Sequence, residues 1–288
     1  MKLIKYFIQF IIVIILFLIF KLIGYERASN FGSKIGSVFG KFLRSEKIII
    51  KNLDIIIKNS NLKVENKNML VNDVYSNYGR ILSEYMYIDK FRKGSLNNYV
   101  NIKGMNHIEE IKSKNKKVVF ISGHFNNFEL MALFIEASGV NLAAIYRPLN
   151  NIFLNKIMEN IRIKYICKNQ IKKGKAGTRE LLHYLKKDFS VALMIDQRVS
   201  EGIKCKLFGE LASTTTIPAQ IVKKYGSEVV PVYIERINNN KFDLTFEKPI
   251  SFEKKLNIGE ITIELNKILE KMILKNPSQW ILTHNRWK

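Results

Sequence analysis

Hydrophobic positions divide the chain into three regions with different periodicities. The first is an almost unbroken apolar run from Tyr6 to Phe20, in which Gln9 is the one polar residue. Counted from Leu3 to Ile23 the segment has 21 positions, close to the ~20 residues that cross a bilayer as a helix. We expect residues 1–24 to be an uncleaved membrane anchor, because no A-x-A-like cleavage site follows the run. A cleaved signal peptide is the alternative.

The second region, residues 24–116, is mostly helical by pattern. Phe31, Ile35 and Phe42 fall at helical spacing, and an adjoining stripe of Gly32, Gly36 and Gly40 predicts close packing against another helix or lipid. Residues 69–86 carry a second apolar stripe, in which Arg80 and Glu84 predict an i, i+4 ion pair on the surface. A short strand is expected at 100–103, before a helix that starts near residue 106.

From Lys117 onward short strands alternate with helices. Strands are expected at 118–121, 142–146, 163–167, 191–195 and 229–235, with an edge strand at 242–247. Helices are expected at 152–163, 176–186, 218–225 and 258–274. This alternation is typical of an α/β fold with a mixed, largely parallel sheet flanked by helices. We therefore predict the N-terminal anchor followed by one domain, residues 25–288.

The candidate chemistry begins where the strand at 118–121 ends. Ser122-Gly123 breaks the apolar run, His124 follows, and Glu129 lies five positions later at the start of a helical pattern. Five residues rotate by about 500° on a helix, so His124 and Glu129 meet only if His124 lies in the loop before the helix. A histidine held by a carboxylate suits a general base that acts on a hydroxyl. The alternative is a partly buried histidine beside a surface glutamate.

Two further polar residues occupy equivalent places in the pattern. Arg147 follows the strand at 142–146, and Asp196 follows the strand at 191–195. Functional residues in parallel sheets collect at the carboxyl ends of the strands, so His124, Arg147 and Asp196 can line one edge.

The composition indicates an anionic partner, and the motifs absent from the sequence exclude several classes of site. The 288 residues contain 47 Lys and Arg against 25 Asp and Glu, a net charge of +22. This excess indicates nucleic acid, anionic lipid or an acidic protein as partner, or else reflects a composition biased toward lysine. No nucleic-acid-binding module, P-loop, dinucleotide fingerprint or zinc spacing is visible. Cys167 and Cys205 form no disulfide framework, which favours a reducing compartment, and Cys167 ends an apolar run typical of the core.

Cations also indicate the side of the membrane. Only Lys2 and Lys5 precede the apolar run, whereas six lysines and arginines follow it by residue 47. The positive-inside rule then places the body of the protein in the cytoplasm.

Several short blocks stand in a fixed order along the chain. They are His124-x4-Glu129, Tyr146-Arg147-Pro148-Leu149-Asn150-Asn151, Arg162, Asp196-Gln197-Arg198, Phe208-Gly209 with Ala212-Ser213-Thr214-Thr215, and the C-terminal Trp280 with His284-Asn285-Arg286-Trp287-Lys288. Two weaker blocks precede them, Lys51-Asn52-Leu53 and Tyr78-Gly79-Arg80 with Glu84. Together they resemble the lipid A biosynthesis (lauroyl/myristoyl) acyltransferases, a branch of the lysophospholipid acyltransferase superfamily. The resemblance runs from the anchor to the last residue, and Asn285 stands where that family usually has arginine.

The resemblance implies transfer of a fatty acyl group from acyl-carrier protein to a hydroxyl of a lipid A precursor, on the cytoplasmic side of a bacterial inner membrane. It implies His124 as general base, oriented by Glu129, without a metal or other cofactor. Substrate binding would fall to Arg147, Arg162, Asp196, Gln197 and Arg198. Arginines of this kind bind phosphates or an oxyanion, or else form surface ion pairs.

The C-terminal block and the overall function each have alternatives. Trp287 and its neighbouring cations are expected at the membrane interface, with a frayed basic tail as the alternative. A related acyltransferase that acts on a lysophospholipid or another lipid is the first functional alternative. A non-catalytic membrane-tethered protein that binds anionic lipid is the second, and it leaves His124, Glu129 and Asp196 unexplained.

Overall fold

A seven-stranded sheet forms the centre of the computed structural model, which describes residues 2–288. Its strand order is β1-β9-β8-β2-β5-β3-β4, and a separate two-stranded hairpin pairs β6 with β7. The strands are β1 (Val100–Lys103), β2 (Val118–Ser122), β3 (Leu142–Tyr146), β4 (Asn169–Lys172), β5 (Ser190–Met194), β6 (Ile203–Leu207), β7 (Glu210–Thr214), β8 (Glu228–Ile237) and β9 (Lys241–Phe246).

Five neighbouring strands, β8, β2, β5, β3 and β4, are parallel to one another. β9 runs antiparallel to β8, and β1 pairs with β9 in parallel. All five residues of β2 are buried, as expected for a strand between two parallel neighbours with both faces covered. The predicted α/β class with a mixed, largely parallel sheet is confirmed.

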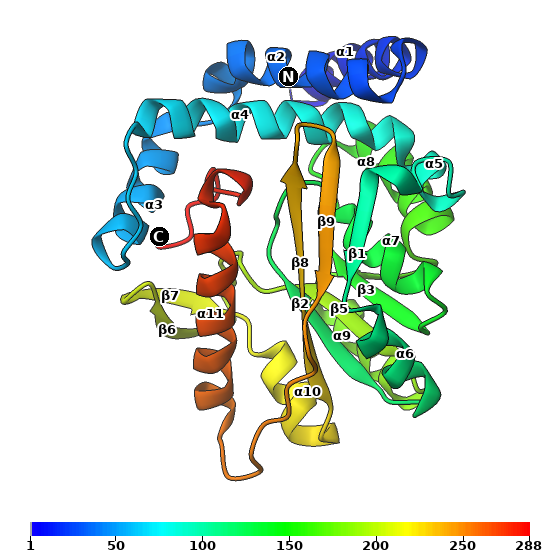
Figure 1. Ribbon diagram of the computed structural model, residues 1–288, viewed down its shortest axis with the longest axis vertical. Helices are drawn as coiled ribbons and strands as arrows, with labels where there is room; N and C mark the ends of the chain where they lie inside the picture. The colour runs from blue at the N-terminus through cyan, green and yellow to red at the C-terminus, as the bar shows by residue number, and fades with distance from the viewer. Residues whose placement is uncertain (1) are drawn as a thin grey trace.

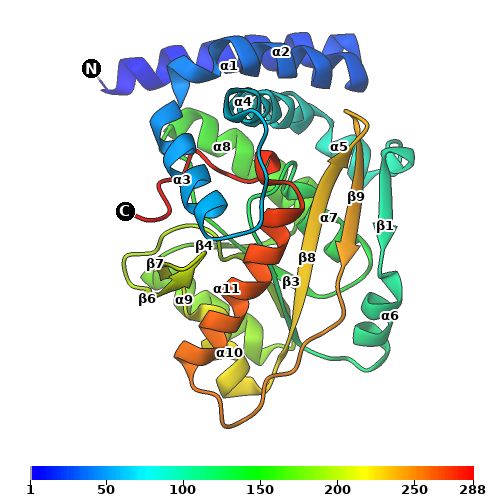
Figure 2. The same cartoon turned by 60° about the vertical axis from the view of Figure 1, so that its left-hand side comes forward.

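Helices cover both faces of the sheet and form a separate layer above its carboxyl edge (Figures 1 and 2). α7 contacts β3 and β8, α9 contacts β3, β4 and β5, and α10 contacts β2 and β8. The helices around the sheet are α5 (Ile88–Arg92), α6 (Met105–Ser113), α7 (Glu129–Ala137), α8 (Ile152–Ile161), α9 (Lys175–Lys186), α10 (Ile217–Tyr225) and α11 (Ile258–Lys275).

The layer above the carboxyl edge consists of α1 (Lys2–Ile23), α2 (Tyr25–Leu43) and α4 (Lys67–Glu84), and α3 (Glu46–Lys58) runs down from it beside the C-terminal segment (Figures 1 and 2). α1 is long and apolar enough to cross a membrane. The glycine stripe of α2 packs on α4 rather than on lipid, so backbones approach closely at Gly32, Gly36 and Gly79. A Cβ on Gly79 would lie 1.9 Å from the carbonyl oxygen of Gly32. This contact fixes α4, whose C-terminal end reaches the sheet edge.

Two details of the predicted elements were wrong. The apolar run 163–167 is not a strand but a π-helical turn at Arg162–Ile166 that follows α8, and strand β4 comes after it. A five-residue apolar run has no period that separates a strand from a buried turn. The strand expected at the sheet edge, β9, is flanked on both sides, because the short β1 pairs with it.

The C-terminal residues do not fray, because several of them pack against the domain. Trp280 is 2% exposed and Arg286 is fully buried. Arg286 donates to the Ser213 carbonyl oxygen and to Thr214 Oγ1, both at 2.7 Å, and Trp287 donates to the Leu207 carbonyl oxygen. Burial lowers the pKa of Arg286 to about 10. The C-terminal segment therefore fastens the β6–β7 hairpin to the domain.

The α2–α4 contact gives the first prediction. Gly79→Ala should lower the free energy of unfolding by ~1–3 kcal/mol, because the added methyl group overpacks a backbone contact, although alanine is the better helix former. Urea unfolding in detergent measures the change. Lys34→Ala, at an exposed position of α2, is the control and should stay within ~0.5 kcal/mol of wild type. Equal stability of the two variants would contradict this account.

Candidate active site

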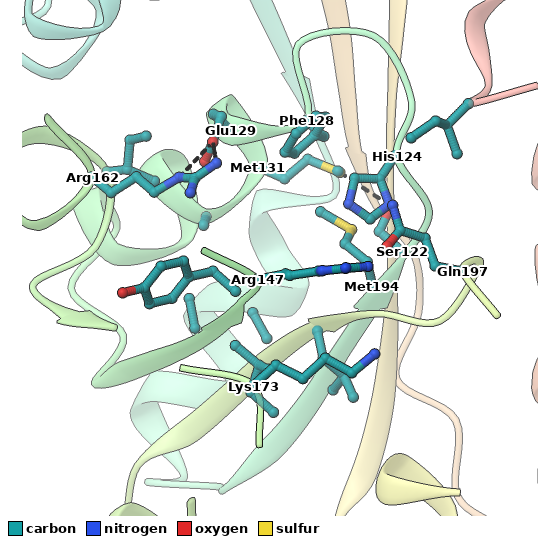
Figure 3. A pocket seen from close by; sticks show the side chains of 18 of the residues that line it. Ser122, His124, Phe128, Glu129, Met131, Arg147, Arg162, Lys173, Met194 and Gln197 are labelled. Atoms are coloured by element: carbon teal, nitrogen blue, oxygen red, sulfur yellow. Dashed lines mark hydrogen bonds and ion pairs between the residues drawn. The ribbon is translucent and has the colours of Figure 1, made fainter. Parts of the chain in front are cut away.

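A cavity of about 450 Å³ opens at the carboxyl edge of the parallel strands, below the N-terminal helices. Apolar and polar side chains both line it, and Figure 3 shows His124, Met194, Arg147 and Lys173 among them. The apolar lining includes Phe120, Met131, Ile135, Ala144, Leu193 and Met194, and the polar lining includes His124, Glu129, Arg147, Arg162, Lys173 and Gln197. An apolar cavity with a few polar groups is the usual form of a small-molecule site.

His124 lies in the loop between β2 and α7, as its position after the Ser-Gly break predicted. β2 and β5 are parallel, with Ser122 opposite Met194. His124 and Asp196 each come two residues beyond this pair, so the register of the two strands brings them together. Asp196 Oδ1 lies 2.8 Å from His124 Nδ1, and Oδ2 accepts from the His124 backbone N–H at 2.7 Å.

Asp196 is fully buried and has a third donor, Trp280 Nε1, at 2.9 Å. Burial alone would raise the pKa of Asp196. The positive charge of protonated His124 and the hydrogen bonds from His124 and Trp280 outweigh burial and lower the pKa below its usual range. Asp196 is therefore an ionised carboxylate that fixes the ring of His124 through Nδ1.

This geometry corrects the expected pairing of His124 with Glu129. Glu129 begins α7 and turns to Arg162, whose Nε and Nη2 lie 2.8 and 2.5 Å from Glu129 Oε1 (Figure 3). Tyr85 donates to the same oxygen at 3.3 Å. Between the two residues, Phe128 packs edge-on against the His124 ring, with centroids 4.8 Å apart. His124 thus has its carboxylate partner in the segment that follows the neighbouring strand β5, and sequence spacing alone pointed to the wrong acid.

The Glu129–Arg162 pair is itself part of the cavity wall. Both side chains are about nine-tenths buried. Burial lowers the pKa of Arg162, but the Glu129 carboxylate more than reverses this, so the guanidinium stays charged. Arg162 Nη1 is buried without a hydrogen-bond partner. One donor of a charged group beside the cavity therefore has no partner within the described residues.

The other predicted binding residues are distributed unevenly. Arg147 and Gln197 line the cavity, and Figure 3 shows the Arg147 side chain extending toward the side where His124 and Gln197 lie. Arg198 is exposed and contributes a backbone N–H to His284 Nε2 at 2.9 Å. Lys173, which sequence analysis did not single out, also lines the cavity. Within the described residues 2–288, no cluster of His, Cys, Asp and Glu could hold a metal ion.

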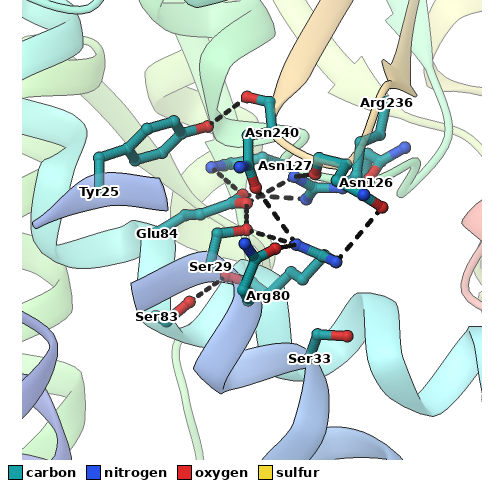
Figure 4. A network of polar contacts seen from close by, with 12 residues as sticks. Tyr25, Ser29, Ser33, Arg80, Ser83, Glu84, Asn126, Asn127, Arg236 and Asn240 are labelled. Atoms are coloured by element: carbon teal, nitrogen blue, oxygen red, sulfur yellow. Dashed lines mark hydrogen bonds and ion pairs between the residues drawn. The ribbon is translucent and has the colours of Figure 1, made fainter. Parts of the chain in front are cut away.

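A buried polar network supports the His124 loop from behind (Figure 4). Glu84, at the end of α4, is fully buried and pairs with both terminal nitrogens of Arg236, at 2.5 and 3.0 Å. Arg236 Nε donates to Asn126 at 3.0 Å, and Asn127 donates to Glu84 at 3.2 Å. The loop that carries His124 is thus tied to α4 and β8.

The expected surface pair of Arg80 with Glu84 was therefore wrong. Arg80 instead donates to Ser29 and Asn30 of α2, at 3.0 and 2.9 Å. Glu84 and Arg236 lie 152 residues apart in the chain, and no local pattern links them. Only the helical spacing of Glu84 gave a sequence signal, and that signal pointed to the wrong partner.

Comparison with known proteins gives a consistent result over the full chain. A family model described as "Bacterial lipid A biosynthesis acyltransferase" matches residues 1–288. The chain is 22% identical over 263 residues to the lipid A biosynthesis palmitoleoyltransferase of Escherichia coli (strain K12), which covers 89% of this chain and 83% of the relative. It is 24% identical over 196 residues to the lipid A biosynthesis lauroyltransferase of the same organism, covering 66% and 62%.

The buried state of Asp196 predicts a pH effect on stability. Its pKa is lowered on folding, so its stabilising contribution is present above the unfolded value of about 3.9 and is lost as the pH falls through the folded value. Asp196→Asn should lower the unfolding free energy at pH 7 by ~2–3 kcal/mol, since hydrogen bonds to a charged group are lost. The variant should also lose less stability than wild type below about pH 4.

Urea unfolding from pH 7 to pH 3 measures both effects. Asp54→Asn, in a surface pair with Lys67 whose side chains are about half exposed, is the control and should leave stability nearly unchanged. An acid dependence identical in Asp196→Asn and wild type would rule out the ionised, partnered Asp196.

A double-mutant cycle tests the Glu84–Arg236 pair. Glu84→Gln should cost ~3–5 kcal/mol, because it leaves a guanidinium buried without its carboxylate. Glu84→Gln combined with Arg236→Met should cost less than the sum of the single changes. Additive free energies from chemical unfolding would exclude direct coupling. Lys34→Gln, at an exposed position of α2, is the control outside the network.

Proposed function

Because the chain belongs to the bacterial lipid A biosynthesis acyltransferase family, we propose that it transfers a fatty acyl group from acyl-carrier protein to a hydroxyl of a lipid A precursor. The observation that carries this proposal is the His124–Asp196 pair at a cavity lined largely by apolar side chains. This arrangement offers a general base next to a compartment for a hydrocarbon chain.

His124 acts as the general base. A hydroxyl is a weak nucleophile and needs a base while it attacks the thioester carbonyl carbon. Nδ1 of His124 is engaged with Asp196, which leaves Nε2 to take the hydroxyl proton. The tetrahedral intermediate then collapses to the new ester, and the carbon–sulfur bond breaks. The departing sulfur takes the proton from His124, so no net proton is gained or lost by the enzyme.

Asp196, rather than Glu129, orients His124 and stabilises its protonated form. The carboxylate has no exposed surface and holds both the ring and the backbone N–H of His124. Such a partner fixes one tautomer and keeps the ring in position throughout the reaction. Glu129 instead holds Arg162, so it affects the reaction by positioning that arginine.

Arg162 and the other cations bind the anionic parts of the reactants. The unpartnered Nη1 of Arg162 is a donor for the oxyanion of the intermediate or for a phosphate. Arg147 and Lys173 line the same cavity, and Gln197 adds an uncharged amide. The exposed Arg198 has no side chain in the cavity lining, and we assign it to the outer part of the acceptor.

The surroundings of the site suit acidic and amphiphilic partners. The net charge of +22 favours acidic acyl-carrier protein, the phosphates of the acceptor and anionic lipid. We place the protein on the cytoplasmic side of a bacterial inner membrane, attached through α1. This helix has the length and apolarity of a single bilayer crossing.

An assay of the membrane-bound protein tests the reaction. Membranes are incubated with acyl-carrier-protein thioesters of several chain lengths and a tetra-acylated lipid A precursor bearing its inner sugars, and mass spectrometry follows the lipid. We expect a mass gain of one acyl chain. His124→Ala should reduce the rate by ~10²–10⁴-fold, the usual contribution of a general base. Asp196→Asn should also reduce the rate of acyl transfer.

Glu129→Gln separates the two carboxylates. It weakens the hold on Arg162 but leaves the His124–Asp196 pair in place, so we expect a smaller fall in rate than for Asp196→Asn. A gain that survives His124→Ala would overturn the mechanism. No gain with any thioester would overturn the substrate assignment, and lysophospholipid acceptors would then test the related acyltransferase. If no acceptor gains mass, the remaining hypothesis is a non-catalytic membrane-tethered protein that binds anionic lipid.

A further inference from the structure

The N-terminal half of α1 lies against the domain rather than projecting from it. Asn151, which caps α8, donates from Nδ2 to the carbonyl oxygen of Tyr6 at 2.8 Å. The Phe153 ring of α8 contacts Phe7 and Phe10 of α1, with ring centroids 5.6 and 5.8 Å apart. Aromatic packing and a side-chain hydrogen bond therefore hold this half of α1 beside the start of α8.

The C-terminal half of α1 is held as well. Phe17 and Phe20 are buried, at 4% and 0% exposure, and the Tyr87 hydroxyl donates to the carbonyl oxygen of Phe20. The contacts from Tyr6 to Phe20 span 14 residues, or about 21 Å at the helical rise of 1.5 Å per residue. α1 thus contacts the domain along most of its length, and it lies with α2 in one layer in both views (Figures 1 and 2).

The side of α1 that does not face the domain is mostly apolar, with polar residues only at Lys2, Lys5, Gln9 and Lys21. Its exposed residues include Ile4 at 66%, Ile8 at 54%, Ile12 at 53%, Leu18 at 60% and Leu22 at 85%. A helix that packs on protein with one side and on lipid with the other needs apolar residues all round. The apolar pattern of such a helix therefore does not distinguish it from a helix that crosses the bilayer.

α2 continues this surface. Its glycines face α4, while Phe31, Val38, Phe39, Phe42 and Leu43 are 41–78% exposed. Of the large hydrophobic side chains exposed in the described chain, most belong to α1 and α2. The surfaces of soluble proteins rarely carry a contiguous apolar patch of this extent.

Charge on the two helices matches an anionic surface. α1 and α2 carry the exposed cations Lys2, Lys5, Lys21, Arg27, Lys34 and Lys41 against the single acid Glu26. Glu26 accepts a hydrogen bond from Tyr99 at 2.7 Å. Apolar side chains flanked by cations are typical of helices that lie in the interface of an anionic bilayer.

From these contacts we propose that α1 and α2 lie flat in the cytoplasmic leaflet of an anionic bilayer, with both helix axes close to the membrane plane. α1 then anchors the protein without crossing the membrane. A crossing orientation would separate α1 from Asn151, Phe153 and Tyr87, or would draw α8 into the hydrocarbon.

The arrangement also places the cavity at the lipid. Arg44, directly after α2, and Leu149, just before α8, both line the cavity. Leu149 is 39% exposed and Ile152 is 58% exposed. An amphiphile in the leaflet can therefore reach the cavity between the end of α2 and the start of α8, without passing through water.

The side of the membrane occupied by the N-terminus tests the proposal. A short hydrophilic Gly/Ser extension carrying one cysteine is placed before residue 1 of the full chain, and Lys186→Cys, exposed on α9, marks the domain side. A membrane-impermeant maleimide is applied to spheroplasts and to inverted membrane vesicles. The parent protein gives the background, since Cys167 and Cys205 are buried.

The two arrangements predict opposite outcomes. Flat helices place both cysteines on the same side, so both are labelled in inverted vesicles and both are protected in spheroplasts. A crossing helix labels the extension in spheroplasts while Lys186→Cys stays protected, and this result would overturn the proposal.

A second measurement tests α2 separately. Phe42→Trp should be quenched by brominated anionic lipids well beyond the background of Trp280 and Trp287 in the parent protein. Quenching no greater than the parent would remove α2 from the membrane surface. Neither measurement depends on acyl transfer, so a failed acyltransferase assay would leave the outcome readable.

Discussion

Three carboxylates are buried at the carboxyl edge of the sheet, and each depends on a nitrogen-bearing side chain from another segment. Asp196 has His124, Glu129 has Arg162, and Glu84 has Arg236. An ionised carboxylate in the interior is strongly destabilising unless it is paired and hydrogen-bonded. The positions of β2, β5, β8, α4, α7 and the turn after α8 are therefore linked through these three pairs. The loop that carries His124 lies between them.

This linkage explains how a short loop presents a base in a fixed orientation. The β2–β5 register brings Asp196 beside His124, and Trp280 from the C-terminal segment completes the shell of Asp196. Behind the loop, Asn126 and Asn127 bind Arg236 and Glu84. The residue Asn126 has a φ of 45°, a left-handed conformation that non-glycine residues rarely adopt. Its contacts to Arg236 and Gln279 over-determine this conformation.

The layer above the sheet edge connects the site to lipid. α4 supplies Glu84 to the loop on one side and receives the glycines of α2 on the other. Ser29 of α2 donates to Glu84 at 2.7 Å, so a helix on the apolar surface contacts the same network that supports His124.

The amino-acid sequence by itself determined the fold class, the family and the loop position of His124. These depend on local periodicity and on short blocks in order, which one chain displays directly. The tertiary structure decided which groups meet. Sequence spacing favoured Glu129 as the partner of His124 and Arg80 as the partner of Glu84, because neighbours along a chain are visible in it. The actual partners, Asp196 and Arg236, come from strands 72 and 152 residues away. Strand register and burial select such partners, and neither leaves a periodic signal in the sequence.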